Sequence, residues 1–240
     1  MNAALAAAAT LVASAFALST LDRWLRRRRP HDLAWTVSLA LFALGAGALW
    51  WAESVGWNLG AFRVFYLAGA ILNVPWLALG TVYLLAERRL ADRVRTWLIL
   101  LSGFAVGVVL FAPTHGGISG DELPTGKDVF AVAPRVLAAV GSGIAALIIV
   151  AGAVWSVWHP RRATGARLVS GNVLIATGTL ILSASGTLAG RLGKDRAFAI
   201  TLLVGICVLF AGFLVATGSA TRRPRLDQAT PQQLAADVAR

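Results

Sequence analysis

The sequence predicts an all-α integral membrane protein with seven transmembrane helices. Its 240 residues are 58% hydrophobic and 14% charged, and the mean hydropathy is +0.72, a composition typical of membrane bundles and unlike that of soluble domains. A helix needs about 20 apolar residues to cross about 30 Å of hydrocarbon. Stretches of about that length lie at 3–21, 33–52, 64–86, 96–113, 129–157, 168–188 and 197–220.

These stretches are expected to be helices because they are apolar on every side, whereas the strands of a membrane barrel alternate apolar and polar residues. The first stretch has an alternative interpretation as a cleaved signal peptide. Its arginines, Arg23 and Arg26 to Arg29, follow the apolar core, whereas those of a signal peptide precede it. We therefore expect this stretch to remain as the first helix.

Basic residues gather on alternate connections. Sixteen of the 22 Lys and Arg residues fall on the first, third and fifth connections or on the C-terminal tail. Because cytoplasmic loops accumulate Lys and Arg, the N-terminus is predicted outside and the C-terminus inside a plasma membrane that the chain crosses several times. The expected partners are membrane lipids, with anionic headgroups at the cytoplasmic face, and nucleic acid is not expected.

An internal repeat relates the two halves of the chain. Shifted by 133 positions, the first three stretches align with the last three without a gap, so the possible repeats are residues 1–86 and 129–220. Arg28 and Arg29 then coincide with Arg161 and Arg162. The alternative is chance, since a chain rich in Ala, Leu, Gly and Val produces many matches.

A parallel repeat of three helices requires an odd helix between its copies, and the stretch 96–113 supplies it. Residues 1–220 are thus predicted to form one seven-helix domain, followed by a cytoplasmic tail at 221–240. This three-plus-one-plus-three layout resembles the architecture of SWEET sugar transporters and nicotinamide riboside carriers, and more loosely that of rhodopsins.

The runs FRVFYLAGAILNVPWLALGTVYLL and GTLAGRLGKDRAFAITLLVG resemble uncharacterised seven-helix membrane proteins of actinobacteria, a group that implies no function. SWEET proteins carry an asparagine in two equivalent helices, but Ile206 is the residue equivalent to Asn73 here, so sugar transport is not implied. Lys127 and Lys194 lie in or near loops, which excludes a retinal Schiff base in the last helix.

Residues for catalysis or ion coupling are sparse in the apolar stretches. Every Asp and Glu falls in a connection or at the end of a stretch, so no carboxylate is expected in mid-membrane. His31, His115 and His159 are predicted in connections, and Cys207 has no intrachain thiol partner. We therefore expect no cofactor, no metal site and no enzyme.

Two polar groups inside the stretches form a candidate substrate-binding region. Asn73 precedes Pro75, which cannot donate to the carbonyl of Ile71, so a kink with a free acceptor is expected there. Trp76 is the tryptophan placed deepest in a stretch. The second group, at spacings of seven and four on one helical face, is Asn172, Thr179 and Ser183. The alternative for both groups is helix packing.

Arg63 and Arg196 occupy equivalent positions at the predicted outer end and form a candidate anion site. Alternatively, Glu53 and Asp195 neutralise them, or the arginines reach lipid headgroups. The loop 114–128 is the expected lid or partner contact. Eight tryptophans are expected at the membrane interface. They are Trp24, Trp35, Trp50, Trp51, Trp57, Trp97, Trp155 and Trp158.

The leading functional hypothesis is a small uncoupled carrier or facilitator for a small polar or anionic solute, based on the repeat and on the polar residues of the third and sixth stretches. The alternative is a non-transporting seven-helix receptor, or a structural subunit of a homo-oligomer or larger membrane complex. Measured solute flux separates the two hypotheses.

Overall fold

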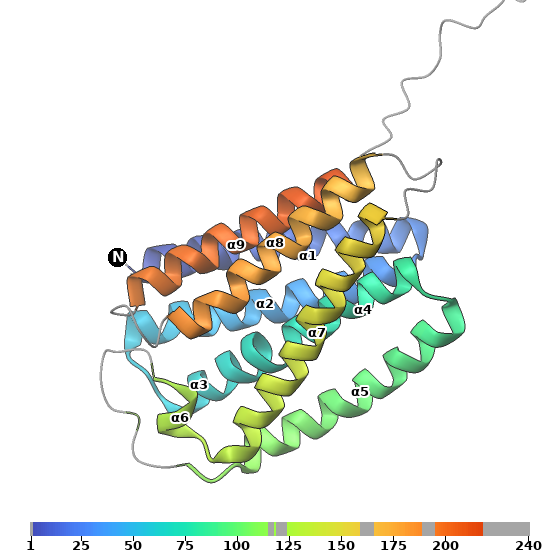
Figure 1. Ribbon diagram of the computed structural model, residues 1–240. Helices are drawn as coiled ribbons and strands as arrows, with labels where there is room; N and C mark the ends of the chain where they lie inside the picture. The colour runs from blue at the N-terminus through green and yellow to red at the C-terminus, as the bar shows by residue number, and fades with distance from the viewer. Residues whose placement is uncertain (1, 115–117, 119–123, 159–165, 189–194, 218–240) are drawn as a thin grey trace, which may run out of the picture.

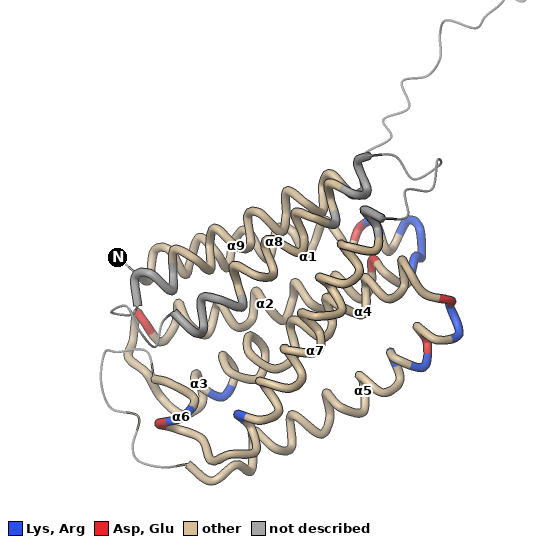
Figure 2. The backbone as a smooth tube through the Cα atoms, viewed as in Figure 1, with Lys and Arg blue, Asp and Glu red and all other residues tan. Residues whose placement is uncertain are grey.

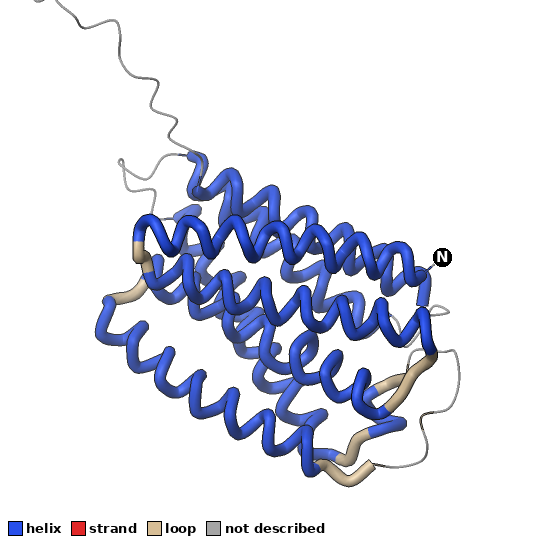
Figure 3. The backbone as a smooth tube through the Cα atoms, turned by 180° about the vertical axis from the view of Figure 1, so that it is seen from behind, coloured by secondary structure: helices blue, strands red, loops and turns tan. Residues whose placement is uncertain are grey.

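The computed structural model describes residues 2–114, 118, 124–158, 166–188 and 195–217. Regular structure there is helical, apart from an isolated bridge between Thr114 and Phe130, which confirms the all-α prediction (Figures 1 and 3). The elements are α1 (Asn2–Arg27), α2 (Pro30–Val55), α3 (Leu59–Phe65), η1 (Tyr66–Leu72), α4 (Asn73–Leu85), α5 (Arg88–Phe111), α6 (Gly126–Val129), α7 (Val132–Trp158), α8 (Ala166–Leu188) and α9 (Asp195–Thr217).

Five of the described helical segments are long and apolar enough to cross a membrane. They are Ala3–Arg27, Pro30–Val55, Leu59–Leu85, Arg88–Phe111 and Val132–Trp155. The described apolar parts of α8 and α9 are shorter, Val173–Leu182 and Ile200–Val215. Large apolar side chains cover outward surfaces, including Leu11, Phe104 and Leu147, which are 62–71% exposed. Such a surface is compatible with immersion in a bilayer.

The described helices pack as a closed ring, with α5 outside it. α1 packs against α2, α2 against the continuous segment α3–η1–α4, and α4 against α7. The ring continues from α7 to α8 and α9, and α9 returns to α1. α5 runs along one side of the bundle, against α4, η1 and α7 (Figure 1).

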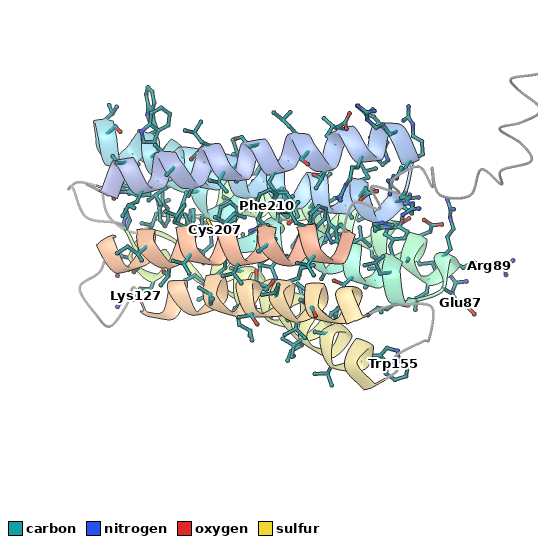
Figure 4. The ribbon with its side chains drawn as sticks, turned by 90° about the horizontal axis from the view of Figure 1, so that it is seen from above. Glu87, Arg89, Lys127, Trp155, Cys207 and Phe210 are labelled. Atoms are coloured by element: carbon teal, nitrogen blue, oxygen red, sulfur yellow. The ribbon has the colours of Figure 1, made fainter. Side chains whose placement is uncertain are left out.

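Apolar side chains fill the interior of this ring. On α2, buried residues recur at spacings of four and three, which places them on one helical face. They are Trp35, Leu39, Phe42, Ala46 and Leu49. Phe16 of α1 is fully buried, and its ring centroid lies 4.3 Å from that of Phe210, which points from α9 toward α1 (Figure 4). The interior is therefore packed rather than open.

Charged residues mark the two ends of the bundle. One end, called the basic end below, carries the arginines of the α1–α2 and α4–α5 connections (Figure 2). Glu87 and Arg89 lie there, and Lys127 lies at the opposite end (Figure 4).

A π-helical segment, η1, precedes Pro75, where the sequence predicted a kink with a free acceptor. The backbone N–H of Asn73 donates to the carbonyl of Ala68, five residues earlier. The hydroxyl of Ser142 on α7 donates to the carbonyl of Ala70 at 2.6 Å. The carbonyl that accepts a side-chain hydrogen bond is therefore that of Ala70, whereas the free carbonyl was predicted at Ile71. The difference is one residue because a π-helical turn is one residue wider than an α-helical turn.

Glycines allow α8 and α9 to pack backbone to backbone. A Cβ atom at Gly178 would lie 2.7 Å from the backbone nitrogen of Leu209 and 2.9 Å from the carbonyl oxygen of Gly205. Those neighbours are backbone atoms, so they cannot rotate away from an added methyl group.

We expect Gly178→Ala to lower the free energy of unfolding, because overpacking costs about 1–3 kcal/mol, whereas Ala gains about 1 kcal/mol over Gly in a helix. Unfolding in mixed detergent measures the change. Gly107→Ala on α5 is the matched control, since a Cβ there meets nothing within 4 Å. Equal stability of the two variants would contradict the close α8–α9 contact.

Candidate functional site

Asn73 joins α4 to α2. Its side chain is buried, and the hydroxyl of Ser38 donates to its Oδ1 at 2.8 Å while lying 3.0 Å from its main-chain oxygen. Small polar groups that pair across helices in this way stabilise membrane bundles by about 0.6–2 kcal/mol. The contact matches the packing alternative, and it occupies the amide oxygen that a substrate would otherwise use.

Trp76 is partly buried and joins α4 to α5. Its indole N–H donates to the hydroxyl of Ser102 on α5 at 3.2 Å, and that hydroxyl donates to the carbonyl of Leu98 at 2.7 Å. Trp76 therefore attaches α5 to the ring, and its indole N–H is bound to Ser102.

Thr179 is 1% exposed and donates to the carbonyl of Ile175 at 2.8 Å, within its own helix. It lies on α8, which packs mainly on α9 and α7, whereas α4 packs mainly on α2 and α7. The side chains of Asn172 and Ser183 lie outside the described part of the structure. Within that part, the predicted substrate-binding residues do not converge on one cavity.

One half of the predicted anion site is described. The Nε of Arg63 on α3 is fully buried and has no hydrogen-bond partner among the described residues. Trp57 packs nearby against Phe62 and Phe65, with ring centroids 6.0 and 5.8 Å apart. The side chain of Arg196 lies outside the described part, as do most residues of the loop 114–128, so the pairing with Arg63 stays a prediction.

The surface near Arg63 carries an apolar groove. It lies between α2 and α3, has a volume of about 320 Å³, and is lined mainly by small and aliphatic residues together with Trp51 and Asn58. Its lining carries no charged side chain, so it does not extend the anion site.

A buried ion pair lies at the basic end, and the sequence did not predict it. The carboxylate of Asp32 is 4% exposed, and its Oδ1 lies 3.3 Å from Nη2 of Arg23 and 3.8 Å from Nε2 of His31. We expected His31 in a connection and Asp32 just before a span. Instead α2 begins at Pro30, because proline at the first helical position and an acid in the first turn both favour a helix start.

The ion pair extends into a network that links three helices. The hydroxyls of Thr20 on α1 and Thr36 on α2 lie 3.0 Å apart, and Thr36 also donates to the carbonyl of Asp32 at 2.8 Å. The guanidinium of Arg23 stands over the ring of Phe213 on α9, 4.1 Å from its centroid. The first, second and last helices of the ring therefore meet at this cluster.

Trp35 lies at the centre of the same cluster. Its ring centroid is 5.3 Å from that of His31 and 4.9 Å from that of Phe213. It also covers Gly80 on α4, where a Cβ atom would lie 2.0 Å from the indole nitrogen. The indole N–H has no acceptor in the described structure, although the residue is only 2% exposed.

Exposure separates the tryptophans that were predicted at the membrane interface. Trp50, Trp51, Trp97 and Trp155 are 46–72% exposed, as an interfacial side chain requires. Trp35 and Trp57 are 2% and 6% exposed, so the predicted contact of their indole N–H with water is wrong. Sequence position sets the depth of a residue along a helix, whereas packing decides whether its side chain faces the ring interior or the exterior.

The ion pair had a usable signal in the sequence. Arg23 lies one turn before the end of α1, and Asp32 lies in the first turn of α2. A two-residue turn between antiparallel helices places such residues at the same depth, where opposite charges pair.

Comparison of the chain with known protein families, with curated protein sequences and with solved structures gives no match. Among the described residues, no group of three or more His, Cys, Asp or Glu side chains is arranged to hold a metal ion. The site must therefore be interpreted from its own geometry.

We expect Asp32→Asn to destabilise the protein by about 3 kcal/mol, because it leaves the guanidinium of Arg23 largely buried and unpaired. Asp22→Asn is the matched control: Asp22 pairs with Arg26 at 2.9 Å, but its side chain is 57% exposed. An exposed pair contributes about 0–1 kcal/mol. Equal unfolding free energies for the two variants would contradict the burial of Asp32.

Proposed function

We propose that this chain is a multi-pass plasma-membrane protein with seven transmembrane helices, and that it is an uncoupled carrier or facilitator for a small polar or anionic solute. Its N-terminus lies outside and its basic end faces the cytoplasm, in agreement with the positive-inside rule. The proposal depends chiefly on one observation, the repetition of helix contacts around the ring.

The order of helix contacts around the ring is the order expected for two repeated units. The first unit consists of α1, α2 and α3–η1–α4, and the second unit of α7, α8 and α9. Within the units, α1–α2 packing corresponds to α7–α8 packing, and α2–α4 to α8–α9. Between them, α4 contacts α7 and α9 contacts α1, so the two seams correspond as well. α5, the odd helix that a parallel repeat requires between the units, lies outside the ring.

Burial patterns give independent support, since burial was not used to align the sequence. Many positions 133 residues apart are both buried. Examples are Phe16 and Ile149, Phe42 and Ile175, Gly45 and Gly178, Ala46 and Thr179, and Asn73 and Ile206. These pairs support equivalent inward faces in the two proposed units, although other pairs differ, such as Ile71 and Val204, which are 1% and 46% exposed.

Two similar units around a shared axis provide the geometry of a rocking carrier, in which one unit moves against the other and exposes a central site to each side in turn. The seam between α4 and α7 contains small side chains, where Gly152 packs against Thr81 and Leu85. The π-helical segment η1 borders that seam and adds a point at which the backbone ladder changes register.

The packed apolar interior favours a second candidate, a non-transporting receptor or structural subunit. Both candidates are consistent with a chain that interacts with membrane lipids and forms homo-oligomers or larger membrane complexes. They differ in whether a solute crosses.

Flux into proteoliposomes tests the proposal. We expect downhill uptake of at least one member of a panel of neutral sugars, amino acids and small carboxylates, without dependence on a proton gradient. In a Cys207→Ala background, Thr81→Cys with Gly152→Cys should form a disulfide across one seam and abolish that uptake, because rocking requires the seam to open. Reductant should restore it.

Thr81→Cys alone is the control and should transport under both conditions. Absence of flux for the whole panel, with the protein folded, would contradict the carrier proposal and favour the second candidate.

A further inference from the structure

Trp35 touches both units of the ring at equivalent positions. Gly80 and Phe213 are 133 residues apart, the offset of the repeat, and they lie on the third helix of each unit. The indole of Trp35 covers Gly80 on one side and meets the ring of Phe213 at a 4.9 Å centroid distance on the other. In a twofold arrangement, equivalent positions lie on opposite sides of the axis, so a side chain that touches both lies on the axis.

This contact lies near the basic end. Gly80 is five residues before the end of α4, and Phe213 is four residues before the end of α9. At 1.5 Å per helical residue, Trp35 blocks the axis about 6–8 Å from that end of the helices. The residue at the equivalent position of the second unit is Leu168, so the first unit alone provides an aromatic side chain there.

The ion-pair network holds Trp35 in place. His31 packs edge-on against the indole, and the carboxylate of Asp32 lies near both His31 and Arg23. Arg23 in turn stands over Phe213, the aromatic contact on the far side of the axis. Weakening the Arg23–Asp32 pair would therefore loosen His31 and Phe213, the two rings that pack against the indole of Trp35.

The indole N–H of Trp35 has no acceptor among the described residues, which favours movement. A buried donor without an acceptor is rare and costly in a static core, where phenylalanine would pack without that cost. If the side chain of Trp35 alternates between a closed position and an open position in contact with water, its indole N–H finds a hydrogen-bond acceptor in the open position.

We infer that Trp35 is the gate of the central path at the basic end, closed against Gly80 and Phe213 and latched by the Arg23–Asp32 pair. The inference rests on the proposed carrier function and names the element that closes its cytoplasmic mouth.

Cysteine accessibility tests the gate without requiring transport. In a Cys207→Ala background, Ala46→Cys places a reporter on the inward face of α2, three turns from Trp35 and 4% exposed. The protein is held in lipid nanodiscs and treated with a charged methanethiosulfonate that does not enter lipid. Trp35→Ala should raise the labelling rate about tenfold or more, because a closed gate exposes the path only in a minor state.

Several variants make the test specific. Trp97→Ala removes a tryptophan that is 72% exposed on α5 and should leave the rate unchanged. Trp35→Phe keeps an aromatic plug and should also label slowly. Gly80→Ala should raise the rate by pushing the indole aside, and it replaces Trp35→Ala if that variant does not fold. Asp32→Asn should raise the rate by a smaller factor.

Unchanged labelling in folded Trp35→Ala and Gly80→Ala would overturn the gate even if the wild type transports a solute. Faster labelling in both, with no flux in the wild type, would establish the gate geometry and contradict only the carrier function. Equal acceleration by Trp97→Ala would overturn the gate as well, since it would indicate general loosening of the bundle.

Discussion

Backbone and most side-chain polar groups inside this apolar bundle find their partners within the protein, and the rest of the structure depends on that constraint. Among the described residues, the indole N–H of Trp35 is an exception. This constraint favours helices, because each helix satisfies its backbone N–H and C=O groups internally. It also explains why the hydroxyls of buried Ser and Thr side chains donate to nearby carbonyl oxygens. Where Pro75 interrupts the backbone ladder, the segment widens into η1 and Ser142 of α7 serves a carbonyl. The same contact ties the segment α3–η1–α4 to α7, so a local requirement of the backbone also fixes a contact between two helices of the ring.

The two units that we propose differ in chemistry. The residue that aligns with Asn73 is Ile206, and the residue that aligns with Gly80 is Phe213. The Ser38–Asn73 contact and the Arg23–Asp32 pair lie in the first proposed unit, whereas Phe213 on α9 supplies an aromatic surface.

Helix positions were predictable from the sequence because they depend on local properties, namely the length of apolar stretches and the arginines at their ends. Neither Trp35 nor Asp32 is placed by these local properties, and the signal for Asp32 is instead the charge of Arg23 at the same depth across the short α1–α2 turn. Both lie near the end of a predicted span, where sequence indicates an interfacial residue, and only the packing of α1, α4 and α9 around α2 turns them inward. Asn73 was recognised as polar and deep, but its partner Ser38 lies 35 residues away, at a distance that helix periodicity does not reach.

Closure of the ring between its first and last helices is the central claim, and one cross-linking measurement tests it most directly. Phe16 and Phe210 lie in contact across the α1–α9 seam, with ring centroids 4.3 Å apart. With cysteines at both positions, in a Cys207→Ala background and in native membranes, a short thiol-specific cross-linker should join α1 to α9 within a single chain. Absence of this intramolecular product, or a product that links separate chains instead, would contradict the closed ring and the two-unit arrangement built on it.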